Sequence, residues 1–598
     1  MLSPAQAQQM TASRATAQYL IPLTKDKQHA TGYDIYPSFP ATGPIYTGFD
    51  TLASRISAQS SNIVLDGYGG VLWESFIEKL QSALAKLNID AHFIAVADAL
   101  LPSSHITHLT ASSIGGEDPL FGKRFTGTLS EFFAADKLQQ LQPTPGKLNI
   151  IYGCGASLAG WSAPIFYIDI PKNEIQFRSR AGKVCNLGQS APDNNPKRQY
   201  KQFYFVDWPV LNRHKKQLLP HIDVIIDEQR INDISWCTGA TLRETLADMS
   251  RHSFRARPWF EPGVWGGQWI KDKIPTLNPD VVNYAWSFEL IAPENGILLE
   301  SNNVLLEVTF DTLQMLDNEA LLGKAAARFP ETFPIRFDFL DTFDGGNLSV
   351  QCHPSVAYTK ENFGEDFTQD ETYYILDAKP DAKVYLGFQE DINATEFEQV
   401  LQNSFHRHEP VDIEKYVQVF PSHKHDLFLI PNGTVHSSGK NNLVLEISAT
   451  PYIFTFKMYD WLRADLSGQP RTLNIDRAFA NLDFERKGAI VKNTLLSQPM
   501  TIQTGHDWQI VYLPTHPQHF YRIERLEFNS TITLSTAGQC HILSLVEGST
   551  IKVITDGREQ TVHYAETFIV PAATGTYTLV SEDEPVKVVR SFMKEECC

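Results

Sequence analysis

The sequence predicts a multidomain protein in which an N-terminal α/β domain precedes an all-β region with a helical insertion. Two observations carry this prediction. Up to about residue 250, short apolar segments alternate with amphipathic helical segments, as in a mostly parallel sheet flanked by helices. Beyond that point, short apolar segments follow one another with turn residues between them, as in antiparallel barrels and jelly rolls.

The length of 598 residues predicts roughly three or four domains at about 150 residues each, because single hydrophobic cores stop growing well below this length. We place the α/β domain in residues 1–250, with an irregular, proline-broken lead-in. Around residues 251–267 the composition shifts to Arg, Trp, Phe and Pro, which marks a boundary. A first β-barrel domain is expected in residues 251–490, with a helical insertion at 394–405, and a second small barrel in residues 491–598.

The α/β domain begins with a strand, a glycine loop and a helix. Residues 62–66 read as a buried strand, Gly67, Gly69 and Gly70 form the loop, and residues 72–87 have helical periodicity. This order can place backbone N–H groups around a phosphate, but the loop lacks the lysine of a working P-loop. The domain faintly resembles P-loop nucleoside and uridine kinases. We therefore predict a degenerate, P-loop-like domain of structural or regulatory use, with kinase activity as the alternative.

Composition excludes several classes of partner. The formal net charge of −18 argues against nucleic acid and anionic membranes as partners, so an anionic substrate would need a local cluster of cations. No segment reaches the roughly 18 apolar residues of a membrane span, and residues 1–17 lack the apolar core of a secretion signal. Seven irregularly spaced cysteines do not form a disulfide framework. We expect a cytoplasmic protein.

Four side chains in the first barrel domain are candidate metal ligands. Gln351 and His353 lie two apart in a strand, so both face the same side of it. Glu371 opens an aromatic strand, and His436 follows a Pro-Asn-Gly turn that begins another. One amide oxygen, two imidazoles and one carboxylate would form a mixed N/O site that suits zinc or another divalent first-row metal.

Several motifs resemble the type I mannose-6-phosphate isomerases, which are zinc-dependent enzymes with a cupin fold. They comprise Gln-x-His-Pro, the later Glu, Pro-x-Gly-Thr-x-His, Val264-Trp265-Gly266-Gly267, Phe333-Pro334, Leu443-Val444-Leu445-Glu446-Ile447 and Met458-Tyr459-Asp460. The resemblance runs from about Trp259 to the C-terminus. It implies a double-cupin region and an aldose–ketose isomerase of the mannose 6-phosphate/fructose 6-phosphate type in carbohydrate metabolism, with Gln351, His353, Glu371 and His436 as metal ligands.

Around these ligands the charges depart from the family pattern. Gln369 and Asp338 stand where lysines are usual, and Ser355 stands where an Asp is expected. Lys457 aligns with the family's active-site Arg, which keeps the charge but loses the bidentate fork. Lys457 and Arg336 are the candidate catalytic residues, for contact with anionic groups of the substrate.

Two further expectations concern the β region. Residues 311–329 are amphipathic and predict one helix packed against the first barrel. The second barrel contains only the isolated histidines His541 and His563, so no metal is expected there.

The first hypothesis for function is a metal-dependent isomerase acting on a hexose phosphate, a small-molecule partner. Isomerisation moves a proton between C1 and C2 through an enediol, and so needs a base, a Lewis acid and cations for the phosphate. The rewritten charges favour an alternative, a non-catalytic or altered-specificity sugar-binding or regulatory cupin fused to the degenerate kinase-like domain. A bifunctional kinase–isomerase is a third possibility. The sequence does not fix the oligomeric state.

Overall fold

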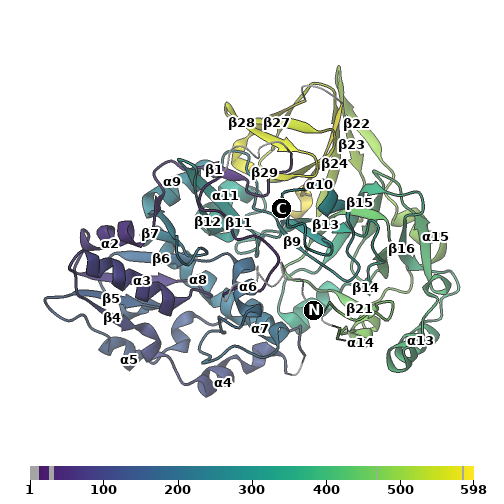
Figure 1. Ribbon diagram of the computed structural model, residues 1–598. Coiled ribbons are helices and arrows are strands. Elements are labelled where there is room, and N and C mark those ends of the chain that lie inside the picture. Colours follow the sequence, from purple (N-terminus) through teal and green to yellow (C-terminus); the bar gives the residue numbers. More distant parts are fainter. Residues whose placement is uncertain (1–12, 26–31, 117, 467, 470, 582–584) are drawn as a thin grey trace. The chain divides into compact units, whose positions relative to one another are not determined.

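In the computed structural model (Figure 1), the chain divides into two compact units. The structure describes residues 13–25, 32–116, 118–466, 468–469, 471–581 and 585–598, so part of the predicted lead-in, including most of the stretch tested for a secretion signal, lies outside the described residues. The first unit contains Tyr36–Ser250 and Pro293–Asn318, and the second contains Arg251–Ala292 and Glu319–Cys598. The placement of Pro293–Asn318 corrects the predicted single boundary at residue 250.

The first unit contains a seven-stranded, mostly parallel sheet. Its order is β2-β8-β7-β6-β3-β5-β4, and the five strands from β7 to β4 are parallel. The strand bounds are β2 Tyr46–Thr47, β3 Asn62–Gly67, β4 Ala91–Ala95, β5 Leu148–Tyr152, β6 Ile165–Asp169, β7 Ile222–Asp227 and β8 Ser235–Thr238. Branched apolar residues fill the central strands, since a parallel sheet is covered on both faces.

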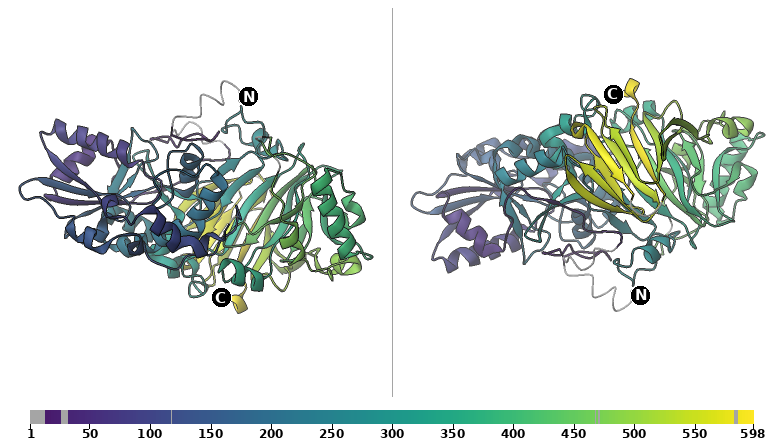
Figure 2. Two further views of the ribbon diagram at one scale, coloured as in Figure 1. Left: turned by 90° about the horizontal axis from the view of Figure 1, so that it is seen from below. Right: turned by 90° about the horizontal axis from the view of Figure 1, so that it is seen from above.

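Helices flank this sheet on both sides (Figure 2). The main helices are α2 Phe49–Ser57, α3 Trp73–Lys86, α4 Ser103–Ile114, α5 Ala135–Gln140, α6 Lys172–Arg180, α7 Pro196–Gln202, α8 Trp208–Leu218 and α9 Gly239–Met249. The predicted strand, glycine loop and helix thus correspond to β3, the loop after it and α3. An α/β domain with a mostly parallel sheet is present, while its likeness to P-loop proteins stays a prediction.

Hydrogen bonds from a buried lysine help to explain why Pro293–Asn318 belongs to the first unit. This segment contains β11 Gly296–Ser301 and β12 Val304–Thr309, which form a small sheet with β1 Ser38–Pro40. Nζ of Lys215 donates to Asp169 at 2.8 Å and to the hydroxyls of Thr309 and Thr312 at 2.9 and 2.6 Å. Lys215 is fully buried, so these bonds replace its lost hydration. Contacts between residues about one hundred positions apart give no sequence signal.

The helix predicted over residues 311–329 is shorter than expected. Helix α11 spans Phe310–Leu322 and is kinked at Asp317, where φ is −149° and ψ is 70°. Its first part belongs to the first unit and its end to the second, so the prediction of one helix packed against the barrel was wrong.

The second unit begins with two antiparallel sheets that form a sandwich. One has the order β18-β15-β20-β13-β10-β9 and the other β17-β16-β19-β14-β21. The first consists of β9 Trp259–Glu261, β10 Trp286–Leu290, β13 Ile335–Asp341, β15 Asp370–Ala378, β18 Leu427–Ile430 and β20 Asn442–Ala449. The second consists of β14 Val350–Cys352, β16 Lys383–Phe388, β17 Val417–Pro421, β19 His436–Ser438 and β21 Phe456–Tyr459. This arrangement is consistent with the predicted cupin-type region.

Helices interrupt this sandwich in several places. They are α10 Trp269–Lys273, α12 Val356–Phe363, α13 Ala394–Arg407, α14 Ile475–Phe479 and α15 Gly488–Thr494. Helix α13 is the predicted helical insertion, and Asn393 caps it by accepting a hydrogen bond from the backbone N–H of Glu396.

The C-terminal residues form two more antiparallel sheets, of orders β22-β23-β24-β31-β26-β29 and β25-β30-β27-β28. Their strands are β22 Met500–Thr504, β23 Trp508–Leu513, β24 Tyr521–Phe528, β25 Thr531–Ser535, β26 His541–Glu547, β27 Thr550–Thr555, β28 Arg558–His563, β29 Thr567–Val570, β30 Thr576–Val580 and β31 Val586–Met593. Leu526, Leu545 and Phe568 lie in their shared core. In Figure 2 these yellow strands lie beside the green strands of the first sandwich. Among the described residues, no helix is long and apolar enough to span a membrane.

Candidate metal centre

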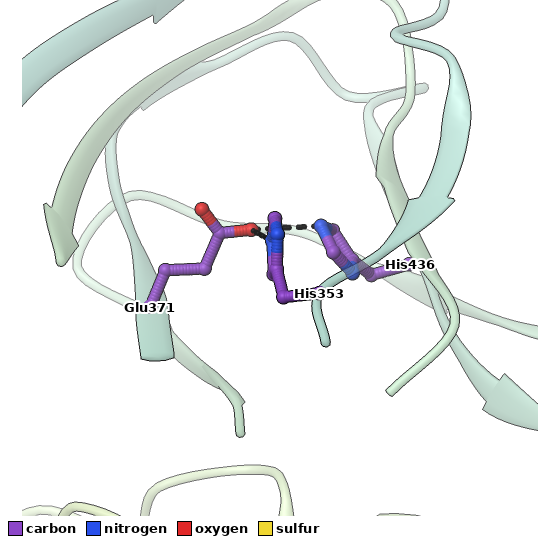
Figure 3. Close-up of side chains that lie close together, drawn as sticks. All are labelled: His353, Glu371 and His436. Carbon is purple, nitrogen blue, oxygen red and sulfur yellow. Dashed lines mark hydrogen bonds and ion pairs between the residues drawn. The ribbon is translucent and has the colours of Figure 1, made fainter. Parts of the chain in front are cut away.

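His353, Glu371 and His436 converge inside the first sandwich (Figure 3). Oε1 of Glu371, on β15, lies 2.6 Å from Nε2 of His353 and 2.7 Å from Nε2 of His436. His353 directly follows β14, and His436 begins β19, so the two sheets contribute from opposite sides. At most 1% of each residue is exposed. Among the described residues, this is the one group of three or more His, Cys, Asp or Glu side chains close enough to share an ion.

The outer nitrogens of both imidazoles are held by the backbone. Nδ1 of His353 lies 2.9 Å from the carbonyl oxygen of Phe454, and Nδ1 of His436 lies 2.9 Å from that of Thr434. A carbonyl oxygen only accepts, so each Nδ1 carries the proton and donates it. In the neutral rings, both Nε2 lone pairs therefore face the carboxylate oxygen. Three acceptors at these distances repel one another unless protons or a cation lie between them, and this donor set suits a divalent metal.

The carboxylate of Glu371 and the imidazole of His353 shift each other's pKa. Burial disfavours the carboxylate of Glu371, but His353 and His436 outweigh it and lower its pKa well below the usual range. Burial likewise disfavours the charged form of His353, but Glu371 outweighs it and raises the pKa of His353. The site therefore keeps its carboxylate ionised and ready to bind a cation.

Gln351 lies beside the triad but presents the wrong end of its amide. It pairs with His436 across β14 and β19, and its Nε2 lies 3.3 Å from Nε2 of His436. Its Oε1 accepts a hydrogen bond from the hydroxyl of Ser349 at 3.0 Å. Because the two ends of an amide differ little in shape, a half-turn of the side chain would bring the oxygen to the metal position. Gln351 as a ligand thus remains a prediction.

The two candidate cations lie on different sheets. Lys457, which is half-buried, pairs with Gln351 on β14, so it shares the face that carries Gln351 and His436. Arg336 is 5% exposed, pairs with Ser448 on β20, and donates from Nη2 to the carbonyl of Pro451 at 2.7 Å. Ser448 in turn pairs with Glu371, which places Arg336 on the same face as the carboxylate.

Two acids lie on the same inner face as Glu371. Asp338 and Glu446 are directly opposite each other on β13 and β20 and are 6% and 9% exposed. Burial, and then the charge of Glu371, raises the pKa of Asp338 to about 8. Burial, and then Asp338 and Glu371, raises the pKa of Glu446 well above its usual range. Burial and mutual repulsion therefore favour the protonated form of both carboxyl groups.

The remaining departures from the family pattern have local structural roles. Nε2 of Gln369 lies 3.3 Å from Oε2 of Glu371, and its Oε1 accepts from the backbone N–H of Phe454 at 3.0 Å. Gln369 thus steadies the carboxylate without adding charge. Ser355 caps helix α12 by accepting from the backbone N–H of Tyr358 at 3.2 Å.

Sequence reasoning missed some of the residues that build the site. The carbonyls that fix the imidazoles, and the register that sets Glu446 against Asp338, depend on strand pairing between distant segments. One feature of the sequence could have indicated Glu446. In an alternating strand its side chain lies on the face opposite to Leu445 and Ile447.

A family described as a domain of unknown function (DUF8485) matches residues 48–251. The probable mannose-6-phosphate isomerase GmuF of Bacillus subtilis (strain 168) is 25% identical over 331 residues, which cover 55% of this chain and 96% of that protein. The mannose-6-phosphate isomerase ManA of the same organism is 29% identical over 222 residues, or 37% of this chain and 65% of that protein. A solved mannose 6-phosphate isomerase from Bacillus subtilis aligns with a TM-score of 0.46 and 18% identity, covering 56% of this chain and 98% of that one.

The facing sheets and the buried pair of imidazoles with one carboxylate define a β-sandwich protein whose interior is suited to a metal ion. Over the part that these sequence relatives cover, the chain is similar to mannose-6-phosphate isomerases.

Proposed function

We propose that this protein is a metal-dependent aldose–ketose isomerase acting on a hexose phosphate of the mannose 6-phosphate/fructose 6-phosphate type. The convergence of His353 and His436 on Oε1 of Glu371 carries the proposal. Similarity to mannose-6-phosphate isomerases supports a sugar phosphate as the small-molecule substrate. We place this activity in residues 251–490, treat 491–598 as a second cupin barrel without metal ligands, and expect the enzyme to work in the cytoplasm.

The bound metal would be held by His353, Glu371 and His436, with Gln351 as a fourth ligand after its amide turns. Zinc fits this set of nitrogen and oxygen donors. When bound, it would act as a Lewis acid toward the oxygens on C1 and C2 of the sugar. Hydrogen bonds from both imidazoles to backbone carbonyls fix the rings, so the ligands need little rearrangement to bind it.

Two cationic side chains, Lys457 and Arg336, would complete the site. Lys457 lies in line with Gln351 and His436, where its ammonium group can contact a negative charge on the substrate and steady the enediolate. Arg336 lies in line with Ser448 and Glu371 and would serve a second anion contact.

One observation favours a second candidate function. Asp338, at a position where the family usually has lysine, faces the same interior as Glu371 and is buried beside Glu446. An acid at this place weakens any binding of a phosphate near it. The alternative is therefore a sugar-binding or regulatory cupin of altered specificity, fused to the degenerate kinase-like domain of residues 1–250.

A coupled assay for fructose 6-phosphate formed from mannose 6-phosphate tests the proposal. The full chain should contain about one metal ion per molecule by elemental analysis, and turnover should vanish after chelation and return with added zinc. His353→Ala and His436→Ala should lose both metal and activity. His423→Ala, which removes an exposed imidazole from a turn, should retain both.

Failure of turnover across a panel of hexose and pentose phosphates, with metal bound, would overturn the isomerase proposal. Calorimetric binding of a sugar under those conditions would instead support the regulatory alternative. If the protein contains no metal as purified and binds none when zinc is added, the isomerase proposal is wrong, because it depends on a bound metal.

A further inference from the structure

A cavity of about 470 Å³ lies within the second unit, where the first sandwich meets the C-terminal sheets. The first sandwich contributes helix α10 and the turn between β17 and β18. The C-terminal sheets contribute the turn between β26 and β27 and the turn between β28 and β29. Small-molecule sites commonly have this size and lie at such junctions. Among the described residues that line it, none belongs to the candidate metal centre, so this junction cavity is a separate place in the molecule.

Small residues in two tight turns keep the junction cavity open. Gly548, Ser549 and Ala565 line it with little or no side chain. Gly548 has a φ of +99°, and a Cβ atom there would lie 2.4 Å from Cγ1 of Val586, so this position requires glycine. The backbone N–H of Tyr564 donates to the carbonyl of Ser549 at 3.0 Å and joins the two turns. The cavity is therefore formed before any ligand binds.

Aromatic rings line part of the junction cavity. Trp269 on α10 is 6% exposed, and its indole N–H donates to Asp377 at 2.9 Å, which fixes the ring. The rings of Trp269 and Tyr564 lie 5.9 Å apart between centroids at an angle of 56°, and Tyr33 lines the cavity as well. A planar base stacks on a flat aromatic face, whereas two rings at this angle form a corner. Such a corner offers apolar contact to the carbon-bound hydrogens of a puckered sugar ring.

The charged side chains that line the junction cavity are Lys273, Lys424 and Glu547. One oxygen of Glu547 lies 3.2 Å from Nζ of Lys424, and the other accepts from Lys587, outside the cavity, at 3.0 Å. Lys273, at the end of α10, is exposed and makes no hydrogen bond or ion pair with the described residues. Two ammonium groups thus face the cavity beside one carboxylate that a third ammonium group already neutralises.

The neighbouring acids are engaged elsewhere. Glu566, next to the cavity-lining His563, is buried and lies 2.5 Å from Nη1 of Arg255. Asp377 does not line the cavity and accepts the indole N–H of Trp269. On a chain with a net charge of −18, an anionic ligand needs such a local group of cations. Lysine binds phosphate as a point charge, so the junction cavity suits a phosphate group.

We propose that the junction cavity binds a phosphorylated sugar at a second site of this protein. Lys273 and Lys424, which are exposed, bind the phosphate group, and the corner of Trp269 and Tyr564 receives the sugar ring. The carboxylate of Glu547 accepts from hydroxyl groups of the sugar. This site needs neither the metal nor turnover, so it goes beyond the isomerase function and does not depend on it.

Calorimetric titration of the chelator-treated full chain with glucose 6-phosphate and with glucose tests this site. The wild type should bind glucose 6-phosphate more tightly than glucose, because only the phosphate engages the two ammonium groups. Lys273→Gln should weaken glucose 6-phosphate about tenfold and leave glucose within about twofold, and so should Lys424→Gln. Lys492→Gln, an exposed position on helix α15 outside the cavity, should change neither ligand and serves as the matched control.

The same titrations can contradict the second site in three ways. If Lys273→Gln and Lys424→Gln bind glucose 6-phosphate as the wild type does, or if the wild type shows no saturable binding, the proposal is wrong. Loss of all binding in Lys457→Gln would place the ligand in the interior of the first sandwich and overturn it as well. Tighter binding of adenosine monophosphate than of glucose 6-phosphate, lost in Lys273→Gln, would show that the cavity takes a planar base and not a sugar.

These readouts separate the second site from the isomerase proposal, because they use protein without metal and do not involve turnover. An inactive protein with the expected ratios of dissociation constants would refute the isomerase proposal and preserve the second site. An active isomerase whose sugar phosphate binding is unchanged in Lys273→Gln would do the reverse.

Discussion

Oε1 of Glu371 lies 2.6 Å from Nε2 of His353, although the two residues belong to different sheets of the sandwich. The imidazole is fixed from behind by the carbonyl of Phe454, so its lone pair and the carboxylate are aimed at the same point. This arrangement is costly without a cation, because each group has been removed from water. A metal ion should therefore stabilise the fold as well as complete the site.

The first prediction concerns this stabilisation. Zinc at one hundred times its dissociation constant should add about 2.7 kcal/mol to the free energy of unfolding and raise the melting temperature. His436→Ala should abolish the increase, because only two ligands of the triad remain, whereas His423→Ala should keep it. Differential scanning fluorimetry with and without chelator measures both. An equal rise for wild type and His436→Ala would place the metal elsewhere.

The sequence was sufficient where the information is local. It predicted the strand at residues 62–66 and the helix at 72–87, which are β3 and α3, and the helical insertion that is α13. It also predicted that Glu371 and His436 lie at strands, which are β15 and β19, whereas His353, predicted within a strand, directly follows β14. It could not assign Pro293–Asn318 to the first unit, because this assignment depends on hydrogen bonds from Lys215 to the distant Thr309 and Thr312. Nor could it show that Glu446 lies directly opposite both Asp338 and Tyr373, because this depends on the register of three strands.

A second prediction tests the buried lysine that ties this segment to the parallel sheet. Lys215→Met should lower the free energy of unfolding of the first unit by about 3–5 kcal/mol, because Asp169 would remain buried without its partner. Thermal unfolding followed by circular dichroism measures the loss. Lys216→Met, on the exposed side of the same helix α8, should be close to neutral. The double variant Lys215→Met/Asp169→Leu should recover part of the loss, and an additive double variant would contradict the pairing.

A third prediction concerns pH and Asp207. Burial raises the pKa of this carboxyl to about 7. Hydrogen bonds to one of its oxygens from the side-chain amide of Asn186 and the backbone N–H of Leu187 lower the pKa, but burial outweighs them. Between pH 4 and 7 the folded state therefore binds one proton more than the unfolded state, so the stability contribution of Asp207 falls as pH rises through this window. Asp207→Asn keeps both donors and removes the charge. It should be nearly neutral at pH 4 and stabilising by a few kcal/mol at pH 8.

Melting curves from pH 4 to 8 measure this difference, with the exposed Asp136→Asn on helix α5 as control. A constant difference between wild type and Asp207→Asn across the range would show that Asp207 is ionised throughout.

The last prediction uses two fully buried tyrosines that differ in one respect. The hydroxyl of Tyr373 has no hydrogen-bond partner among the described residues, whereas that of Tyr521 donates to the carbonyl of Ile447 at 3.0 Å. Loss of an unsatisfied buried hydroxyl removes a desolvation cost, while loss of a paired one leaves the carbonyl without its donor.

Tyr373→Phe should therefore raise the free energy of unfolding of the ligand-free protein by about 1 kcal/mol, and Tyr521→Phe should lower it by about the same amount. Chemical denaturation of the two variants side by side measures this difference. A Tyr373→Phe variant that is destabilised as much as Tyr521→Phe would mean that the hydroxyl of Tyr373 already has a hydrogen-bond partner in the folded protein.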